Sequence, residues 1–102
     1  MSIKKQYLKA KATCKVTFRL PKKAAPDARK AVIAGDFNRW QTHQNPMKHL
    51  KSGDFTVTLE LDIGREYQYR FLVDDRQWIT DEGADKYAES GYADSQNSVV
   101  VV

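Results

Sequence analysis

Two tryptophans are the side chains best placed to bind a ligand. Trp40 lies in a turn-rich stretch, residues 36–46, and Trp78 follows a turn at the start of a short apolar segment. A large apolar ring in a loop either packs back into the core or stands exposed for a ligand. Packing is the commoner outcome for one such ring. Two of them near loop ends, in a chain already well supplied with core residues, leave both interpretations open.

An exposed pair of indole rings suits a sugar. The C–H face of a pyranose stacks on an aromatic ring, while its hydroxyls need donors and acceptors. Arg70, at an outward-facing strand position before Trp78, carries a rigid fork of N–H donors. Asn97 offers a donor and an acceptor near the C-terminus. These four residues are candidates for a flat, polar-rimmed site for a run of glucose units.

Catalytic patterns are missing from the sequence. There is no G-x-S-x-G elbow, and Cys14 occupies the core face of a predicted strand without a plausible base. Acidic residues are adjacent at Asp74/Asp75 and Asp81/Glu82, but neighbours on a strand point to opposite faces. We therefore expect turn and solvation roles for these carboxylates, and a protein that is not an enzyme.

A metal site is not expected either. His43 and His49 are six residues apart with no cysteine beside them and no H-E-x-x-H context. A calcium site from Asp81, Glu82 and Asp85 is conceivable, but these residues lack the spacing of an EF-hand. We expect no cofactor.

Apolar and polar residues alternate with a period of two from residue 14 onward, which is typical of half-buried strands. Turn formers separate these segments, and no helical period follows residue 14. The alternation predicts strands at residues 14–20, 31–34, 47–50, 55–61, 67–73, 78–80 and 98–102, with a polar, acidic loop over residues 81–95. About seven short strands at this spacing predict an all-β fold of two packed antiparallel sheets.

Positive charge is concentrated at the N-terminus. Residues 1–31 carry ten Lys/Arg and a single acid, Asp27, whereas the remainder carries seven Lys/Arg and twelve acids. We divide the chain into a basic arm, residues 1–13, and a sandwich, residues 14–102. The arm has room for a turn of helix through Ile3, Tyr7 and Leu8. A solvated terminus is favoured over a nucleic-acid contact, because aromatic residues are sparse there.

Length and composition agree with one globular domain. The chain has 102 residues, of which 41% are hydrophobic and 29% charged. No apolar run reaches the length of a membrane helix. Because no apolar stretch follows the basic N-terminus, we expect no secretory signal. A single cysteine, Cys14, cannot form an internal disulfide, so we expect a cytoplasmic protein.

Several motifs in order resemble the isoamylase N-terminal-like domains, carbohydrate-binding module family 48. Residues 32–40 (VIAGDFNRW), followed by Pro46-Met47, are similar to the family's GxFNxW…PM opening. Gly64, residues 67–74 (YQYRFLVD), Trp78 and Asp81 are similar to its G-x-x-Y-x-Y-[KR]-F-x-V-D-G-x-W-x-x-D segment. Residues 97–99 (NSV) resemble its closing motif. The family includes the glycogen-binding domain of the AMP-activated kinase β subunit.

The resemblance implies an immunoglobulin-like, early-set β-sandwich that binds α-1,4-linked glucans such as glycogen or maltooligosaccharides. The two stacking tryptophans would be Trp40 and Trp78. Arg70 would take the place of the kinase domain's lysine, and Asn97 that of its asparagine. Ser95 would supply a small hydroxyl group. The leucine that precedes this hydroxyl in the kinase domain has no counterpart in residues 92–95, and Asp75 stands where the family usually has glycine.

Two principal functions follow from these observations. The first is a stand-alone, non-catalytic α-glucan-binding module, which would deliver or regulate a glycogen-metabolising enzyme or a kinase-type complex. The alternative is a protein–protein interaction or regulatory domain that keeps the fold without binding sugar. No membrane partner is expected, and nucleic acid is the least favoured ligand.

Overall fold

The computed structural model describes residues 3–90 and 96–102, which form nine β-strands and two short 3-10 helices. In chain order the elements are β1 (Ile3–Leu8), β2 (Thr13–Leu20), η1 (Lys22–Ala24), β3 (Ala31–Gly35), η2 (Asp36–Asn38), β4 (Lys48–His49), β5 (Phe55–Asp62), β6 (Glu66–Val73), β7 (Gln77–Ile79), β8 (Lys86–Glu89) and β9 (Gln96–Val101). No helix in this part of the chain is long and apolar enough to span a membrane.

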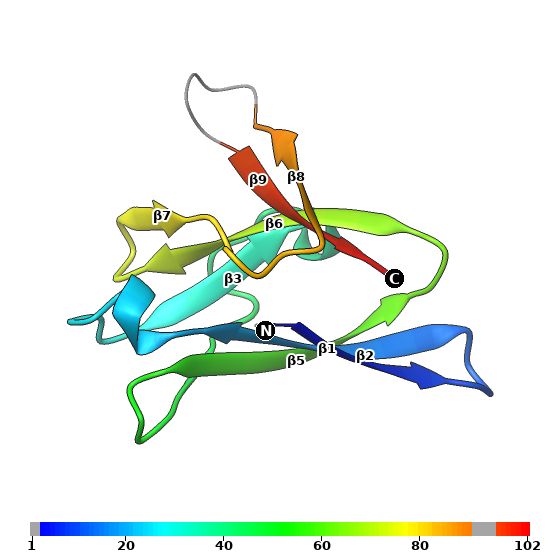
Figure 1. Ribbon diagram of the computed structural model, residues 1–102, viewed down its shortest axis with the longest axis horizontal. Helices are drawn as coiled ribbons and strands as arrows, with labels where there is room; N and C mark the ends of the chain where they lie inside the picture. Colours follow the sequence, from blue (N-terminus) through cyan, green and yellow to red (C-terminus); the bar gives the residue numbers. More distant parts are fainter. Residues whose placement is uncertain (1–2, 91–95) are drawn as a thin grey trace.

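The strands form two antiparallel sheets that pack face to face (Figure 1). The first sheet has the order β1-β2-β5-β4, and the second has the order β3-β6-β9-β8, with β7 also paired to β6. The predicted all-β sandwich is confirmed.

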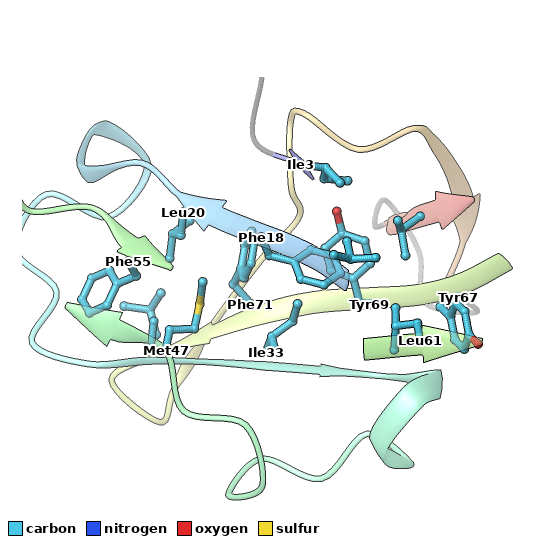
Figure 2. Packing of buried hydrophobic residues seen from close by; sticks show 14 of the residues in the cluster. Ile3, Phe18, Leu20, Ile33, Met47, Phe55, Leu61, Tyr67, Tyr69 and Phe71 are labelled. Atoms are coloured by element: carbon cyan, nitrogen blue, oxygen red, sulfur yellow. The ribbon is translucent and has the colours of Figure 1, made fainter. Parts of the chain in front are cut away.

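Alternation along the strands builds the core between the sheets. In β2, Cys14, Val16, Phe18 and Leu20 are buried, while Lys15 between them is exposed. In β6 the side chains at alternate positions 67, 69, 71 and 73 are buried. The rings of Phe18 and Tyr69 meet edge to face, with their centroids 4.8 Å apart, in the middle of the buried cluster (Figure 2). These contacts hold the two sheets together.

Strand β6 is paired along both edges. Residues 69–73 pair with β3 on one edge. On the other edge, residues 66–69 pair with β9 and residues 71–73 pair with β7. Arg70 therefore marks the point at which one neighbouring strand replaces the other.

The N-terminal segment is a strand, and the expected turn of helix is wrong. All of residues 3–8 pair with β2, from Ile3 opposite Phe18 to Leu8 opposite Thr13. Ile3 is buried, and Lys5 bonds across to Asp85 at 2.7 Å. Hydrogen bonding to an existing strand supplies the stability that so short and basic a segment lacks alone.

A second strand that the sequence did not predict lies within residues 81–95, which we expected to be an acidic loop. Residues 86–89 form β8, which pairs with β9 from Lys86 opposite Val99 to Glu89 opposite Gln96. Its composition carries little strand preference, and its pairing with β9 decides its conformation.

Gly35 lies where the backbones of β3 and β6 approach each other closely. A Cβ atom built on Gly35 would lie 2.7 Å from the Cβ atom of Tyr69 and closer still to the carbonyl oxygen of Gln68. The backbone of Gly35 is extended, with φ −173°, so close packing rather than dihedral freedom requires glycine here.

We expect Gly35→Ala to lower the free energy of unfolding by about 1–3 kcal/mol, because the added methyl group meets backbone atoms that cannot yield cheaply. Urea unfolding followed by tryptophan fluorescence measures the change. A midpoint equal to that of the unsubstituted protein would contradict the close approach of β3 and β6.

The carboxyl group of Asp74 makes the stability of the fold depend on pH in the acid range. Its carboxylate accepts the backbone N–H groups of Arg29 and Lys30 at 2.9 and 3.0 Å. The hydrogen bond from Arg29, which has the larger effect, and the one from Lys30 hold the pKa of Asp74 below its usual value. A carboxyl group with a lowered folded-state pKa stabilises the fold above its unfolded-state pKa, and this contribution disappears as pH falls through the folded-state pKa.

Asp74→Asn should therefore reduce stability at neutral pH, and the difference from the unsubstituted protein should shrink below about pH 4. Asparagine tolerates the left-handed backbone of residue 74, where φ is 51°, so the substitution chiefly removes the charge. Thermal unfolding from pH 7 down to pH 3 measures the effect, with Asp27→Asn as an exposed control. Parallel plots of unfolding temperature against pH for Asp74→Asn and the unsubstituted protein would refute this role of the Asp74 charge.

Candidate functional site

An open depression of about 650 Å³ lies on the face of the second sheet that points away from the first sheet. Its lining residues come from the η2 loop and from β6, β7, β8, β9 and their ends: Asp36, Trp40, Gln68, Arg70, Trp78, Ser90 and Asn97. Four of the five predicted site residues thus gather in one place: Trp40, Arg70, Trp78 and Asn97. The fifth, Ser95, lies outside the described residues, as do its neighbours at positions 91–94.

The two tryptophan rings form an angled pair. Their centroids are 6.5 Å apart and their planes are inclined at 58°. This separation is within the range of direct aromatic contact, so no sugar ring fits between them and their outer faces remain for a ligand. Trp78 is 44% exposed to solvent, whereas Trp40 is half-buried, so Trp78 is the more accessible ring of the pair.

Trp78 is positioned by the short hairpin of β6 and β7. It lies directly opposite Leu72, whose side chain shares the outer face of the second sheet. The turn passes through Asp74 and Asp75, with φ of 51° and 61°, and the N–H of Arg76 bonds to the carbonyl of Val73 at 3.1 Å. Asp75 therefore occupies a left-handed conformation that glycine adopts freely and aspartate tolerates.

Trp40 is positioned by the loop that follows β3, and two residues of this loop, Phe37 and Asn38, attach it to the sandwich. Phe37 turns inward, with its ring centroid 6.0 Å from that of Phe18. Asn38 is buried: it accepts the N–H of Gly35 and donates to the carbonyl of Ile33, both at 3.0 Å. The loop is thus anchored to the sandwich from inside.

The chain then reverses direction at two successive residues. Arg39 and Trp40 both have left-handed backbones, with φ of 58° and 59°. The N–H of Trp40 returns to the carbonyl of Gly35 at 2.9 Å. This sharp turn carries the indole of Trp40 away from the core and toward Trp78.

Arg70 is held by the main chain at the start of β9. Its Nε and Nη2 atoms donate to the carbonyl oxygen of Gln96 at 3.2 and 3.0 Å, and the Thr80 hydroxyl donates to the same oxygen at 2.8 Å. A guanidinium has five N–H groups, so this anchor uses only part of its donor capacity. The side chain is oriented before any ligand arrives.

Asn97 is also oriented by a neighbour. Its Nδ2 atom donates to the side-chain oxygen of Gln68 at 2.9 Å. The amide oxygen of Asn97 is an acceptor that suits a sugar hydroxyl.

Three lining residues were absent from the sequence prediction: Asp36, Gln68 and Ser90. The sequence pattern could have identified Gln68 as a lining residue, because it lies two positions from Arg70 on the same face of β6. Asp36 and Ser90 lie in segments interpreted as loops, where no periodicity indicates the direction of a side chain.

The carboxylate of Asp81 is a structural group. Asp81 is only 3% exposed, accepts the Tyr69 hydroxyl at 2.6 Å and accepts the N–H of Gly83 at 2.9 Å. Burial, together with the Asp81 charge beside it, raises the pKa of Tyr69. Across residues 3–90 and 96–102, no three His, Cys, Asp or Glu side chains cluster as metal ligands do.

One comparison with known proteins finds a short similarity to branching enzymes. The chain is 31% identical over 52 residues to the 1,4-alpha-glucan branching enzyme GlgB 2 of Xanthomonas campestris pv. campestris strain 8004, and equally to that of strain ATCC 33913. The matched segment is 50% of this chain but only 7% of each enzyme, so the similarity concerns a small part of those proteins.

A family comparison covers far more of the chain. The family described as the glycogen recognition site of AMP-activated protein kinase matches residues 14–102, which include both tryptophans and every strand from β3 to β9. This chain belongs to that family of glycogen recognition domains.

Proposed function

We propose that the protein binds α-1,4-linked glucans without catalysis, with the sugar stacked on Trp40 and Trp78. The observation that carries the proposal is the angled tryptophan pair at the edge of an open depression. Indole faces match the C–H faces of glucose units, and the depression supplies polar groups beside them.

The rim of the depression suits a chain of hydroxyls. Arg70 contributes donors, Asn97 contributes an acceptor, and both side chains are already oriented by protein hydrogen bonds. Preorganised polar groups lose little conformational freedom on binding, which favours even a shallow site.

The inclination of the rings favours α-linked over β-linked glucose chains. A β-1,4 chain is a flat ribbon and is best matched by coplanar aromatic platforms. An α-1,4 chain curves, so successive glucose units present their faces at different angles. Rings inclined at 58° match a curved chain better than a flat one.

A regulatory or targeting role fits a domain of this kind. The relatives named above are α-glucan branching enzymes, and the matched family is a recognition site of a kinase. We therefore propose that this domain brings a glycogen-metabolising enzyme or a kinase-type complex to cytoplasmic α-glucan. The site is open and solvated, so we expect weak affinity, about high micromolar to millimolar.

Titration with maltoheptaose should quench or shift the intrinsic fluorescence saturably, because the chain has only two tryptophans and both line the depression. Replacing either Trp40 or Trp78 with alanine should weaken binding about tenfold or more, equivalent to ~1.4 kcal/mol. Isothermal titration calorimetry measures the variants, since fluorescence loses a reporter in each.

Cellohexaose is the matched sugar control, and Tyr7→Ala is the matched protein control, because Tyr7 is 54% exposed in the first sheet, away from the depression. Undiminished binding by the double tryptophan variant would exclude this site. Failure of the unsubstituted protein to bind any glucan would instead favour a protein-interaction domain.

Arg70→Ala should weaken maltoheptaose binding less than either tryptophan change, by about fivefold, because an exposed polar contact contributes about 1 kcal/mol. Arg70→Lys should retain most of the affinity, since the charge and a donor remain. The same calorimetric titration tests both variants. A loss on Arg70→Ala larger than that on Trp78→Ala would contradict stacking as the main source of affinity.

A further inference from the structure

Asp36 is bonded through both of its carboxylate oxygens. Oδ1 accepts the indole Nε1–H of Trp40 at 3.0 Å, and Oδ2 accepts the backbone N–H of Gln68 at 2.8 Å. One side chain thus links a tryptophan in a surface loop to the central strand β6. Asp36 is exposed, and it lines the same depression as Trp40.

The orientation of Trp40 needs such a link. The left-handed backbone at residues 39 and 40 brings the indole out of the core, where close packing cannot hold it on every side. Within the described part of the chain, the ring makes a tilted contact with Trp78 and a hydrogen bond to Asp36. Of these, only the hydrogen bond has a directional donor and acceptor.

The strand end of the link is rigid. The N–H of Gln68 belongs to β6, which is paired with β9 at this residue, and the side chain of Gln68 also accepts Asn97. Asp36 therefore connects the indole of Trp40 to the same strand that carries Arg70. A carboxylate accepting two N–H groups makes stronger hydrogen bonds than a neutral acceptor does.

We propose that Asp36 is a positioning residue that sets the angle of the Trp40 ring relative to Trp78 before sugar arrives. The expected effect of Asp36 on sugar affinity rests on the glucan-binding function proposed above. Its effect on the orientation of the Trp40 ring is measurable without sugar. The benefit to binding is preorganisation, because a ring already held in place loses less freedom when a ligand stacks on it.

The test without sugar uses Trp78→Phe as the parent, so that Trp40 is the only tryptophan. Asp36→Asn is added to this parent, with Asp27→Asn as the control, since Asp27 is an exposed carboxylate that does not line the depression. Asp36→Asn should shift the indole ¹H–¹⁵N resonance of Trp40 and increase its quenching by acrylamide, while Asp27→Asn should change neither. A Trp40 indole indistinguishable between the two variants would overturn the proposal.

The test with sugar is a double-mutant cycle in the otherwise unsubstituted protein. Asp36→Asn should weaken maltoheptaose binding about fivefold. Trp40→Phe keeps a stacking ring but removes the N–H donor, so Asp36→Asn should have a smaller effect in that background. An equal loss in both backgrounds, with an unchanged indole resonance, would mean that Asp36 contacts the sugar directly and would overturn the positioning role.

Thermal unfolding separates these effects from general destabilisation. If Asp36→Asn does not fold, Asp36→Glu keeps the charge while moving the carboxylate by one methylene, and the same indole measurements apply. If the unsubstituted protein does not bind maltoheptaose, the glucan-binding function fails. The indole measurements then still decide whether Asp36 positions Trp40.

Discussion

The structure depends on the two-sided use of strand β6. Its odd positions, Tyr67 to Val73, enter the core, where Tyr69 meets Phe18 of the opposite sheet. Of its even positions, Gln68 and Arg70 line the depression. Because successive side chains on a strand point to opposite faces, the packing that secures the core also fixes the site residues. A shift of one residue in register would exchange the two sets.

Buried groups attach two segments near the depression to the sandwich: the η2 loop, which contributes Asp36 and Trp40, and the segment that follows Trp78. The η2 loop is held by Phe37, which packs against the core, and by the buried amide of Asn38. The segment after β7 is held by Asp81, whose backbone N–H bonds to the Ser98 hydroxyl at 2.8 Å. The exposed tryptophans thus stand on a framework whose polar interior groups are paired, which favours one arrangement of the rings.

Hydrogen bonds around the depression orient the side chains that line it. Arg70 is anchored on the Gln96 carbonyl, Asn97 on Gln68, and Trp40 on Asp36. Each of these side chains keeps a group that suits a sugar. Side chains that are already held in place lose little freedom if a ligand binds, which is the basis of the glucan-binding proposal for this shallow depression.

The sequence by itself determined the strands with clear alternation, the two-sheet fold, and the residue types of the site, because a period of two is a local property of the chain. Trp40, Arg70, Trp78 and Asn97 were singled out by their types and motifs, and the structure places all four around one depression; their contact with sugar stays a prediction. Only the tertiary structure decided that residues 3–8 and 86–89 are strands, since their backbone bonds come from distant partners. It also decided the 58° inclination of the tryptophans and the link from Asp36 to Gln68. These features depend on loop backbone angles and on contacts between segments far apart in the chain, which no local pattern of residues encodes.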